Sequence, residues 1–411
     1  MSEFLTLLPP DEALARFLAI LPAQFTSESI LTEDAAGRVT AAKVKASISL
    51  PSFARSTVDG YAVRARNTHG ASDTLPAYLR LVGEVPMGGP ARIQLAEGEC
   101  ALIHTGGMIP QAADAVVMIE HTQPARENEV EVLRAVGHGE NILQVGEDVS
   151  AGEPVLEVGR LLGAAEIGGL MALGLDHVDV ARKPSVAILS SGDEVIPPGR
   201  SLGEGQVYDV NSYTLRTLVQ AAGGEARTYD IIPDKIDAFR ETAHIALSDN
   251  DLVIFTAGSS VSVRDLTART IDELGKPGVL VHGVNVRPGK PTILAVCNGK
   301  GVIGLPGNPV SALVIANLFV RPAIEKLLGL EATRPAAQVQ AKLTVNLVSA
   351  AGREDWIGVS LKSVDDYFLA DPIFGKSNLI FTLARADGLI RIEPHATGLK
   401  AGEWVSVYLR S

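Results

Sequence analysis

The sequence predicts a multidomain protein of the α/β plus β class, and three observations favour it. The chain has 411 residues, which is more than one hydrophobic core normally organises. Strand-like and helix-like patterns alternate over residues 181–328, as in a three-layer α/β/α domain with a mostly parallel sheet. Short strand-like runs broken by glycine and proline fill residues 50–140 and recur in residues 329–411. These stretches predict a β-rich lobe and a small C-terminal β-barrel-like domain.

Each element of the central domain follows from a local signal. The runs SVAILS, RTYDIIP and DLVIF predict strands, because short apolar runs between turn residues are typical of buried strands. One helix is expected from Asn211, a good N-cap, to Gly223, with Leu215, Leu218 and Val219 on one face. Further helices are expected over residues 234–248, 266–274 and 308–320.

The remaining segments predict a linking domain that is discontinuous in sequence. Residues 11–21, DEALARFLAIL, have the apolar spacing of an amphipathic helix. Helix-like text returns in GAAEIGGLMALGL, within residues 143–180. We therefore expect residues 1–49 and 141–180 to pack together, with the β-rich lobe inserted between them.

Composition narrows the class of protein. With 46% hydrophobic and 20% charged residues the chain is globular, and a net charge of −12 disfavours binding to nucleic acid or to anionic membranes. Two separated cysteines indicate a reduced compartment, and the eight histidines lack the spacing of a zinc site. An acidic N-terminus and the absence of a long apolar run lead us to expect a cytoplasmic protein.

Four loops of the central domain carry polar or basic residues where an open α/β sheet binds ligands. They are SSGDE (190–194), TAGSSVSVRD (256–265), VRPGKP (286–291) and GLPGNPVS (304–311). Taken singly, each loop is equally explained as a solvated turn. Together, their carboxylates and basic residues indicate a site for a phosphate ester with a divalent cation, for which Mg²⁺ is suited. The chain has no Walker or Rossmann glycine motif, which disfavours ATPase and dehydrogenase functions.

The β-rich lobe adds two polar segments, RSTVDGYAV (55–63) and HTGGMIPQAADAVV (104–117). Asp59, Thr105 and Gly106 within them also suit plain turns. If both these segments and the α/β loops are functional, the site lies in a cleft between domains or between subunits.

Many short motifs in one order make the chain similar to a known family. The sequence resembles the molybdopterin molybdenumtransferases, which are related to the E domain of gephyrin, over nearly its whole length. The motifs are DGYAV (59–63), TGGMIP (105–110), ADAVV (113–117), GEDV (146–149), SSGDE (190–194), YDVN (208–211), PGKP (288–291), LPGNPVS (305–311), AGRED (351–355) and SNLIFTLARADGLI (377–390).

The resemblance implies a reaction and an assembly. Adenylylated molybdopterin and molybdate would give molybdenum cofactor and AMP, with Mg²⁺ assisting cleavage of the phosphoanhydride. The subunit would be L-shaped, have four domains and form a homodimer, and the upstream molybdopterin adenylyltransferase is a possible partner. For metal binding or water activation the matching motifs imply Asp59, Asp148, Glu194 and Asp265, of which Asp59, Glu194 and Asp265 are the metal candidates. For substrate binding they imply Thr105, Gly106, Ser191, Gly192, Asp193, Gly258, Ser260, Arg287, Lys290, Pro306, Gly307, Asn308, Ser311, Arg353 and Ser377.

One loop departs from the family pattern. The family's Gly-Gly-Val-Ser-Val-Gly-x-x-Asp-x-x-Lys places glycines at Ala257 and Ser262 and a lysine at Ala268. Arg264 or Arg269 is a candidate replacement for the lost charge. Two alternatives to an active molybdenumtransferase therefore stay open: a catalytically weakened dimeric scaffold that binds molybdopterin, and a molybdopterin adenylyltransferase.

Overall fold

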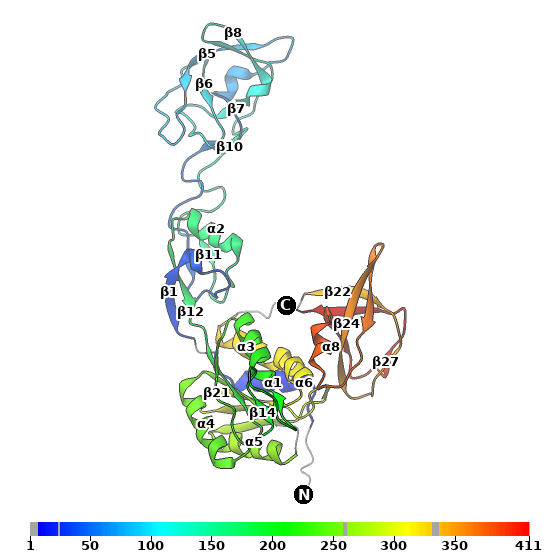
Figure 1. The fold of residues 1–411 in the computed structure, drawn as a ribbon. Helices are drawn as coiled ribbons and strands as arrows, with labels where there is room; N and C mark the ends of the chain where they lie inside the picture. The colour runs from blue at the N-terminus through cyan, green and yellow to red at the C-terminus, as the bar shows by residue number, and fades with distance from the viewer. Residues whose placement is uncertain (1–6, 24, 258–260, 331–336, 411) are drawn as a thin grey trace.

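The protein is an elongated arm that carries a lobe at one end and a base of two domains at the other (Figure 1). The computed structural model describes residues 7–23, 25–257, 261–330 and 337–410. The multidomain α/β plus β fold expected from the sequence is confirmed. Among these described residues, no helix is both long enough and apolar enough to span a membrane.

The distal lobe is a six-stranded sheet. Gly60 allows its central strands to approach, since a Cβ atom there would lie 1.9 Å from the carbonyl oxygen of Val117. Val63, Cys100 and Val130 belong to a buried apolar cluster beneath the sheet. In spatial order the strands are β7 (Ala115–Met118), β4 (Gly60–Val63), β6 (Glu99–Ile103), β5 (Ala77–Glu84), β9 (Glu129–Val132) and β8 (Thr122–Arg126).

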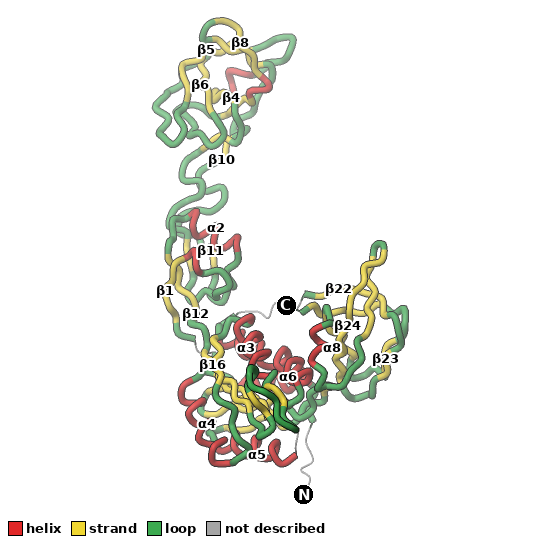
Figure 2. Tube along the Cα trace, viewed as in Figure 1, coloured by secondary structure: helices red, strands yellow, loops and turns green. Residues whose placement is uncertain are grey.

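A linking region joins the lobe to the base, and the chain passes through it twice (Figure 2). The two passages are held together by antiparallel strand pairs and by a small apolar cluster that includes Leu162, Leu170 and Val180. The helix of this region is α2 (Ala164–Ala172). The pairs are β1 (Ser27–Leu31) with β12 (His177–Ala181), β2 (Val44–Lys45) with β11 (Pro154–Leu156), and β3 (Arg55–Ser56) with β10 (Ile142–Leu143).

The α/β domain contains a six-stranded sheet between two helical layers. Four strands are parallel, β20 runs antiparallel to both of its neighbours, and β18 beyond it therefore runs in the same direction as the four. The spatial order is β16 (Glu225–Thr228), β13 (Ser185–Ser190), β17 (Leu252–Ala257), β21 (Lys300–Pro306), β20 (Ile293–Cys297) and β18 (Pro277–His282). A short parallel pair, β14 (Val195–Ile196) and β15 (Val207–Tyr208), follows β13 along the chain.

Helices cover both faces of this sheet (Figure 1). Helices α4 (Ile236–Asp249) and α5 (Val261–Glu273) cover one face. The other face is covered by α1 (Pro10–Ile20), α3 (Asn211–Ala221), α6 (Pro309–Ile315) and α7 (Arg321–Leu327), with a π-helical turn between the last two.

Helix α1 differs from the sequence-based expectation. It does not lie in the linking region with residues 143–180. Instead, Ala13, Phe17 and Leu21 are buried in the apolar cluster of the α/β sheet, together with Leu252 and Ile303. An apolar helix face specifies burial but not the partner surface, so the pattern alone did not distinguish the two domains.

The C-terminal domain is a closed five-stranded barrel. Its strands are β24 (Glu354–Val364), β25 (Tyr367–Pro372), β22 (Gln338–Leu343), β28 (Trp404–Leu409) and β26 (Gly388–Ile392), and β24 pairs with β26 to close the ring. Strand β19 (Val286–Arg287) of the α/β domain joins β24 in parallel. The domain also contains helix α8 (Ile380–Ala384) and the pair β23 (Leu347–Val348) with β27 (Gly398–Leu399).

The entry into the α/β domain is fastened by one carboxylate, that of Asp251. It accepts hydrogen bonds from the Ser185 amide at 2.7 Å and from Arg182 at 2.9 and 3.1 Å. Burial raises the pKa of Asp251, but the Ser185 amide and Arg182 lower it more, so its net shift is downward. The ionised form therefore stabilises the fold at pH values above the carboxyl's unfolded pKa.

We expect Asp251→Asn to lower the free energy of unfolding of the α/β domain by about 1–2 kcal/mol at pH 7. This difference should disappear as the pH falls through the folded pKa of Asp251, because protonation removes the same interaction from the wild type. Far-UV circular dichroism in urea is the appropriate measurement, because both tryptophans lie in the barrel. Asp249→Asn, an exposed neighbour, is the control and should change little. A pH-independent difference would contradict this role.

Candidate active site between the α/β domain and the barrel

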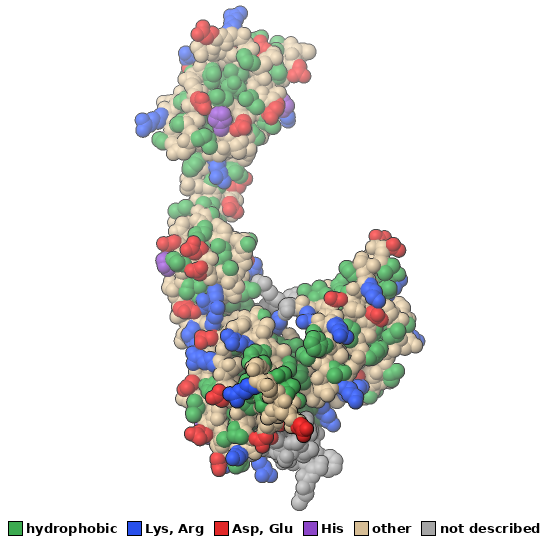
Figure 3. Space-filling model, in the orientation of Figure 1, with side chains coloured by type: hydrophobic (Ala, Val, Ile, Leu, Met, Phe, Trp, Pro, Cys, Tyr) green, Lys and Arg blue, Asp and Glu red, His purple; other side chains and the backbone are tan. Residues whose placement is uncertain are grey.

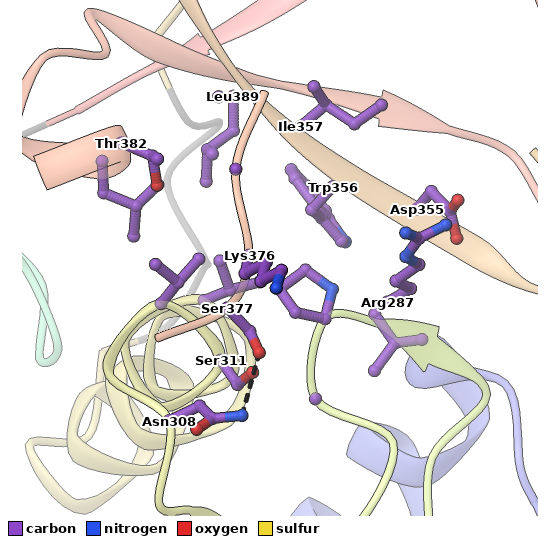
Figure 4. Close-up of a pocket in the computed structure, with 18 of the residues that line it drawn as sticks. Arg287, Asn308, Ser311, Asp355, Trp356, Ile357, Lys376, Ser377, Thr382 and Leu389 are labelled. Atoms are coloured by element: carbon purple, nitrogen blue, oxygen red, sulfur yellow. Dashed lines mark hydrogen bonds between the residues drawn. The ribbon is translucent and has the colours of Figure 1, made fainter. Parts of the chain in front are cut away.

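A cavity of about 1010 Å³ lies where the α/β domain meets the barrel. We call it the interdomain cavity. Its walls come from the segment after β19 (residues 287–291), the start of α6, the start of β24 and the segment 373–378 (Figure 4). Seven predicted substrate-binding residues line it: Arg287, Lys290, Pro306, Asn308, Ser311, Arg353 and Ser377.

Four basic side chains line the cavity, those of Arg287, Lys290, Arg353 and Lys376. Arg287, Lys290 and Lys376 make no side-chain hydrogen bond or ion pair with another described residue, and each is exposed. Arg353 instead forms two hydrogen bonds to the buried carboxylate of Asp355, at 2.7 and 3.0 Å. Lys376 was not predicted, although it directly precedes the predicted Ser377.

Hydrogen bonds fasten the two walls together. The side-chain amide of Asn308 donates to the Ser377 hydroxyl at 2.9 Å (Figure 4). The backbone N–H of Val310 donates to the Ser377 carbonyl at 3.0 Å. Ser311 lines the same cavity and is only 4% exposed. Gly307 does not line the cavity, but its carbonyl accepts a hydrogen bond from Asn211 at 2.8 Å. The cavity thus has fixed walls that carry unpaired cations.

A second group of predicted residues lies at the carboxyl ends of β13 and β16. We call residues 190–194 with Asp234 the carboxylate edge. The Asp234 amide donates to Asp193 at 3.1 Å. Burial, followed by the charges of Asp193 and Glu194, raises the pKa of Asp234. Gly192 has φ 143°, and a Cβ atom there would lie 2.8 Å from the Glu194 carboxylate. Crowded negative charge of this kind favours a bound cation or a proton.

Two buried atoms of the carboxylate edge have no hydrogen-bond partner in the described part of the chain: the Ser191 hydroxyl oxygen and Oδ1 of Asp234. Within the same part, no three His, Cys, Asp or Glu side chains converge enough to hold a metal ion alone. Mg²⁺ needs only one or two carboxylates when substrate phosphates and water complete its shell. The edge therefore fits Mg²⁺ in company with a phosphate substrate. Asp234 was not predicted, although it follows a strand as the other loops do.

The loop 256–265 can be followed only in part. Gly258 and Ser260 lie outside the described residues, as does the side chain of Asp265, whose backbone belongs to α5. Ala257 pairs with Pro306, so this loop departs from the edge of the interdomain cavity.

The remaining predicted residues lie far from this cavity within one chain. Asp59 of the distal lobe accepts hydrogen bonds from the Thr105 amide at 2.7 Å and the Thr105 hydroxyl at 3.2 Å. These bonds, with a smaller contribution from His104, lower the pKa of Asp59. Gly106 follows with φ 87°. Asp148 lines a separate cavity at the junction of lobe and linking region.

An α/β sheet that has carboxylates at its strand ends and a basic cavity at the same end is typical of proteins that bind phosphate esters or small oxyanions. Comparison with known families is more specific. Residues 8–174 match the MoeA N-terminal region (domains I and II), residues 187–326 a probable molybdopterin binding domain, and residues 340–409 the MoeA C-terminal region (domain IV).

Similar proteins span the whole chain. A molybdopterin molybdenumtransferase from Nostoc is 34% identical, with 94% of this chain and 89% of that protein covered. Its counterpart from Haemophilus influenzae is 31% identical, with 97% of both covered. The crystal structure of the molybdopterin biosynthesis MoeA protein from Pyrococcus horikoshii aligns with a TM-score of 0.82 at 31% identity, covering 98% of this chain and all of that one. The chain belongs to the molybdopterin molybdenumtransferase family, enzymes of molybdenum cofactor biosynthesis.

We expect Lys376→Met to weaken binding of a tetrahedral dianion, with molybdate as the probe, by about tenfold, because one charge-assisted hydrogen bond is lost. Trp356 lines the cavity, so its fluorescence in a Trp404→Phe background can report binding. Lys362→Met removes an exposed barrel lysine that pairs with Asp371 instead, and should leave affinity unchanged. Equal effects of the two substitutions would show that Lys376 has no local role.

Proposed function

We propose that this enzyme transfers molybdenum from molybdate into adenylylated molybdopterin, releasing AMP and molybdenum cofactor in a Mg²⁺-dependent reaction. The observation that carries the proposal is the convergence of four basic side chains on one cavity, at the same end of the parallel sheet as the carboxylate edge. Molybdate is a tetrahedral dianion and needs basic groups to bind it. Cleavage of the phosphoanhydride needs a cation that neutralises the phosphate charge. The two regions match these two requirements.

In this proposal the interdomain cavity binds molybdate. The guanidinium groups of Arg287 and Arg353 offer planar forks of N–H donors, and Lys290 and Lys376 add point charges. The hydroxyl groups of Ser311 and Ser377 can donate further hydrogen bonds. The family membership supports this assignment, since the cavity is lined by several of the chain's family motifs.

In the same proposal the carboxylate edge binds the adenylylated end of the substrate. Asp193, Glu194 and Asp234 are the residues that would hold Mg²⁺, which supplies neutralisation of the phosphate charge when bound. Gly192 has no Cβ atom, which lets the Glu194 carboxylate lie close to the backbone at this edge. The unpaired Ser191 hydroxyl is available to a phosphate oxygen.

We further propose that the enzyme acts as a homodimer in which the distal lobe of one copy covers the cavity of the other. Asp59 directly precedes β4 of the distal lobe, and this lobe lies at the opposite end of the arm from the α/β domain and the barrel (Figure 1). Hydrophobic side chains are exposed where the α/β domain meets the barrel (Figure 3). They include Phe374 and Phe381, each 69% exposed, and exposed apolar surface of this kind is typical of interfaces. Acidic Asp59 and Glu84 complement the basic cavity.

The alternative is a weakened scaffold that binds molybdopterin without turnover, and the altered loop is the observation that favours it. Ala268 stands where the family has lysine, and it packs partly buried against the apolar cluster beneath α4 and α5. Arg269, next along the chain, is exposed on α5. The other candidate replacement, Arg264, has a side chain that lies outside the described residues.

The direct test is release of AMP from adenylylated molybdopterin on addition of molybdate and Mg²⁺. We expect turnover by the wild type and none by Asp265→Ala, because the family motif places a carboxylate there for the metal or for water activation. Asp237→Ala, an exposed position at the start of α4, is the control and should remain active. Tight substrate binding without any AMP release by the wild type would favour the scaffold.

The dimer is tested by mixing two inactive variants, Asp59→Asn and Arg353→Gln. If lobe and cavity of one site come from different copies, each mixed dimer regains one intact site, and about a quarter of wild-type activity returns after statistical exchange. If each site is built from one chain, no mixed dimer contains an intact site. An inactive mixture with proven subunit exchange would therefore exclude the shared site.

A further inference from the structure

Strand β24 begins with two consecutive carboxylates that are both buried. Glu354 is 1% exposed and Asp355 is 3% exposed. Successive residues of a strand point to opposite faces, and these two have different partners. Glu354 accepts hydrogen bonds from Trp356 at 2.6 Å and from Arg391 at 2.9 Å. Arg391 also donates a hydrogen bond to Asp11 of α1 at 3.1 Å. Among the described residues, the Asp355 carboxylate is hydrogen-bonded only to Arg353.

The pairing with Asp355 fixes the plane of the Arg353 guanidinium. A guanidinium carries five N–H groups in one plane. Nε and Nη2 of Arg353 each donate to a different oxygen of Asp355, at 2.7 and 3.0 Å. Three N–H groups remain, and the Arg353 side chain is still 30% exposed beside the cavity. Arg353 is thus oriented before any ligand arrives, which lowers the entropy lost on binding.

Arg353 differs in this respect from the other cations of the cavity. Arg287, Lys290 and Lys376 have no side-chain partner among the described residues, so a ligand must order each of them. Asp355 is itself held in place, because its backbone pairs with Arg287 in the β19–β24 ladder. Figure 4 shows Arg287 and Asp355 together on one side of the cavity. The ladder therefore sets the position of the oriented arginine relative to the α/β domain.

We propose that Asp355 is a positioning residue for oxyanion binding, which acts by holding Arg353 toward the cavity. The proposal rests on the proposed function, in which the cavity receives molybdate. It also explains why a buried negative charge lies next to a site for a dianion. Simple Coulomb repulsion predicts that removing this charge tightens binding. A positioning role predicts that removing it weakens binding.

The sign of the change therefore separates the two roles. We expect Asp355→Asn to raise the Kd for molybdate about tenfold in isothermal titration calorimetry, since the oriented fork is lost. Asp355→Glu keeps the charge and should recover part of the affinity. Glu354→Gln, a substitution of equal burial on the opposite face, is the matched control and should bind molybdate like the wild type.

A double-mutant cycle shows whether Asp355 acts through Arg353. In an Arg353→Gln background, Asp355→Asn should cause no further weakening, and loss of its charge should slightly strengthen binding. The double variant also leaves no unpaired buried charge, so it remains measurable if Asp355→Asn alone unfolds. Unchanged or tighter binding by folded Asp355→Asn would overturn this proposal and leave the proposed function intact. Absence of molybdate binding by the wild type would overturn both.

Discussion

The interdomain cavity exists because a two-residue parallel ladder holds the barrel against the α/β domain. Strand β19 leaves the α/β domain and pairs with the first residues of β24. The Asn308–Ser377 hydrogen bond and the Arg391–Asp11 ion pair fasten the same junction at two other points. Every cation of the cavity lies within a few residues of one of these contacts. A small set of polar contacts therefore positions side chains that come from segments far apart in the sequence.

The charge distribution follows from this arrangement. The whole chain carries a net charge of −12, yet the interdomain cavity is lined by four cations and one buried carboxylate. The carboxylate edge concentrates negative charge at neighbouring strand ends, where Asp234 has a raised pKa. Two regions of opposite sign beside one sheet suit a reaction that brings an oxyanion to a phosphoanhydride. The distal lobe adds a further acidic group around Asp59, which the proposed homodimer would bring to this site.

Much of the fold was predictable from local patterns, whereas spatial relations were not. Strands β13 and β17 follow apolar runs between turn residues, as predicted. Strand β16 does not, because it is polar and overlaps only the start of the predicted strand over residues 227–233. Strands β18 and β20 were not predicted, because they form antiparallel pairs that interrupt the alternation of strand and helix. Within the site, the cavity residues that belong to family motifs were predicted from the resemblance to the family. Lys376, Asp234 and Asp355 were not, because their importance comes from neighbours that are distant in sequence. Periodicity records which face is buried and gives no information on which charge lies across from it.

The central claim is that the interdomain cavity binds the metal oxyanion. Anomalous diffraction at the molybdenum absorption edge, from crystals soaked in molybdate, tests it most directly. The account predicts one dominant anomalous peak inside the cavity, within hydrogen-bonding distance of Arg353 and at least one of Arg287, Lys290 and Lys376. A dominant peak elsewhere, or an empty cavity in crystals that bind molybdate at another site, would contradict it.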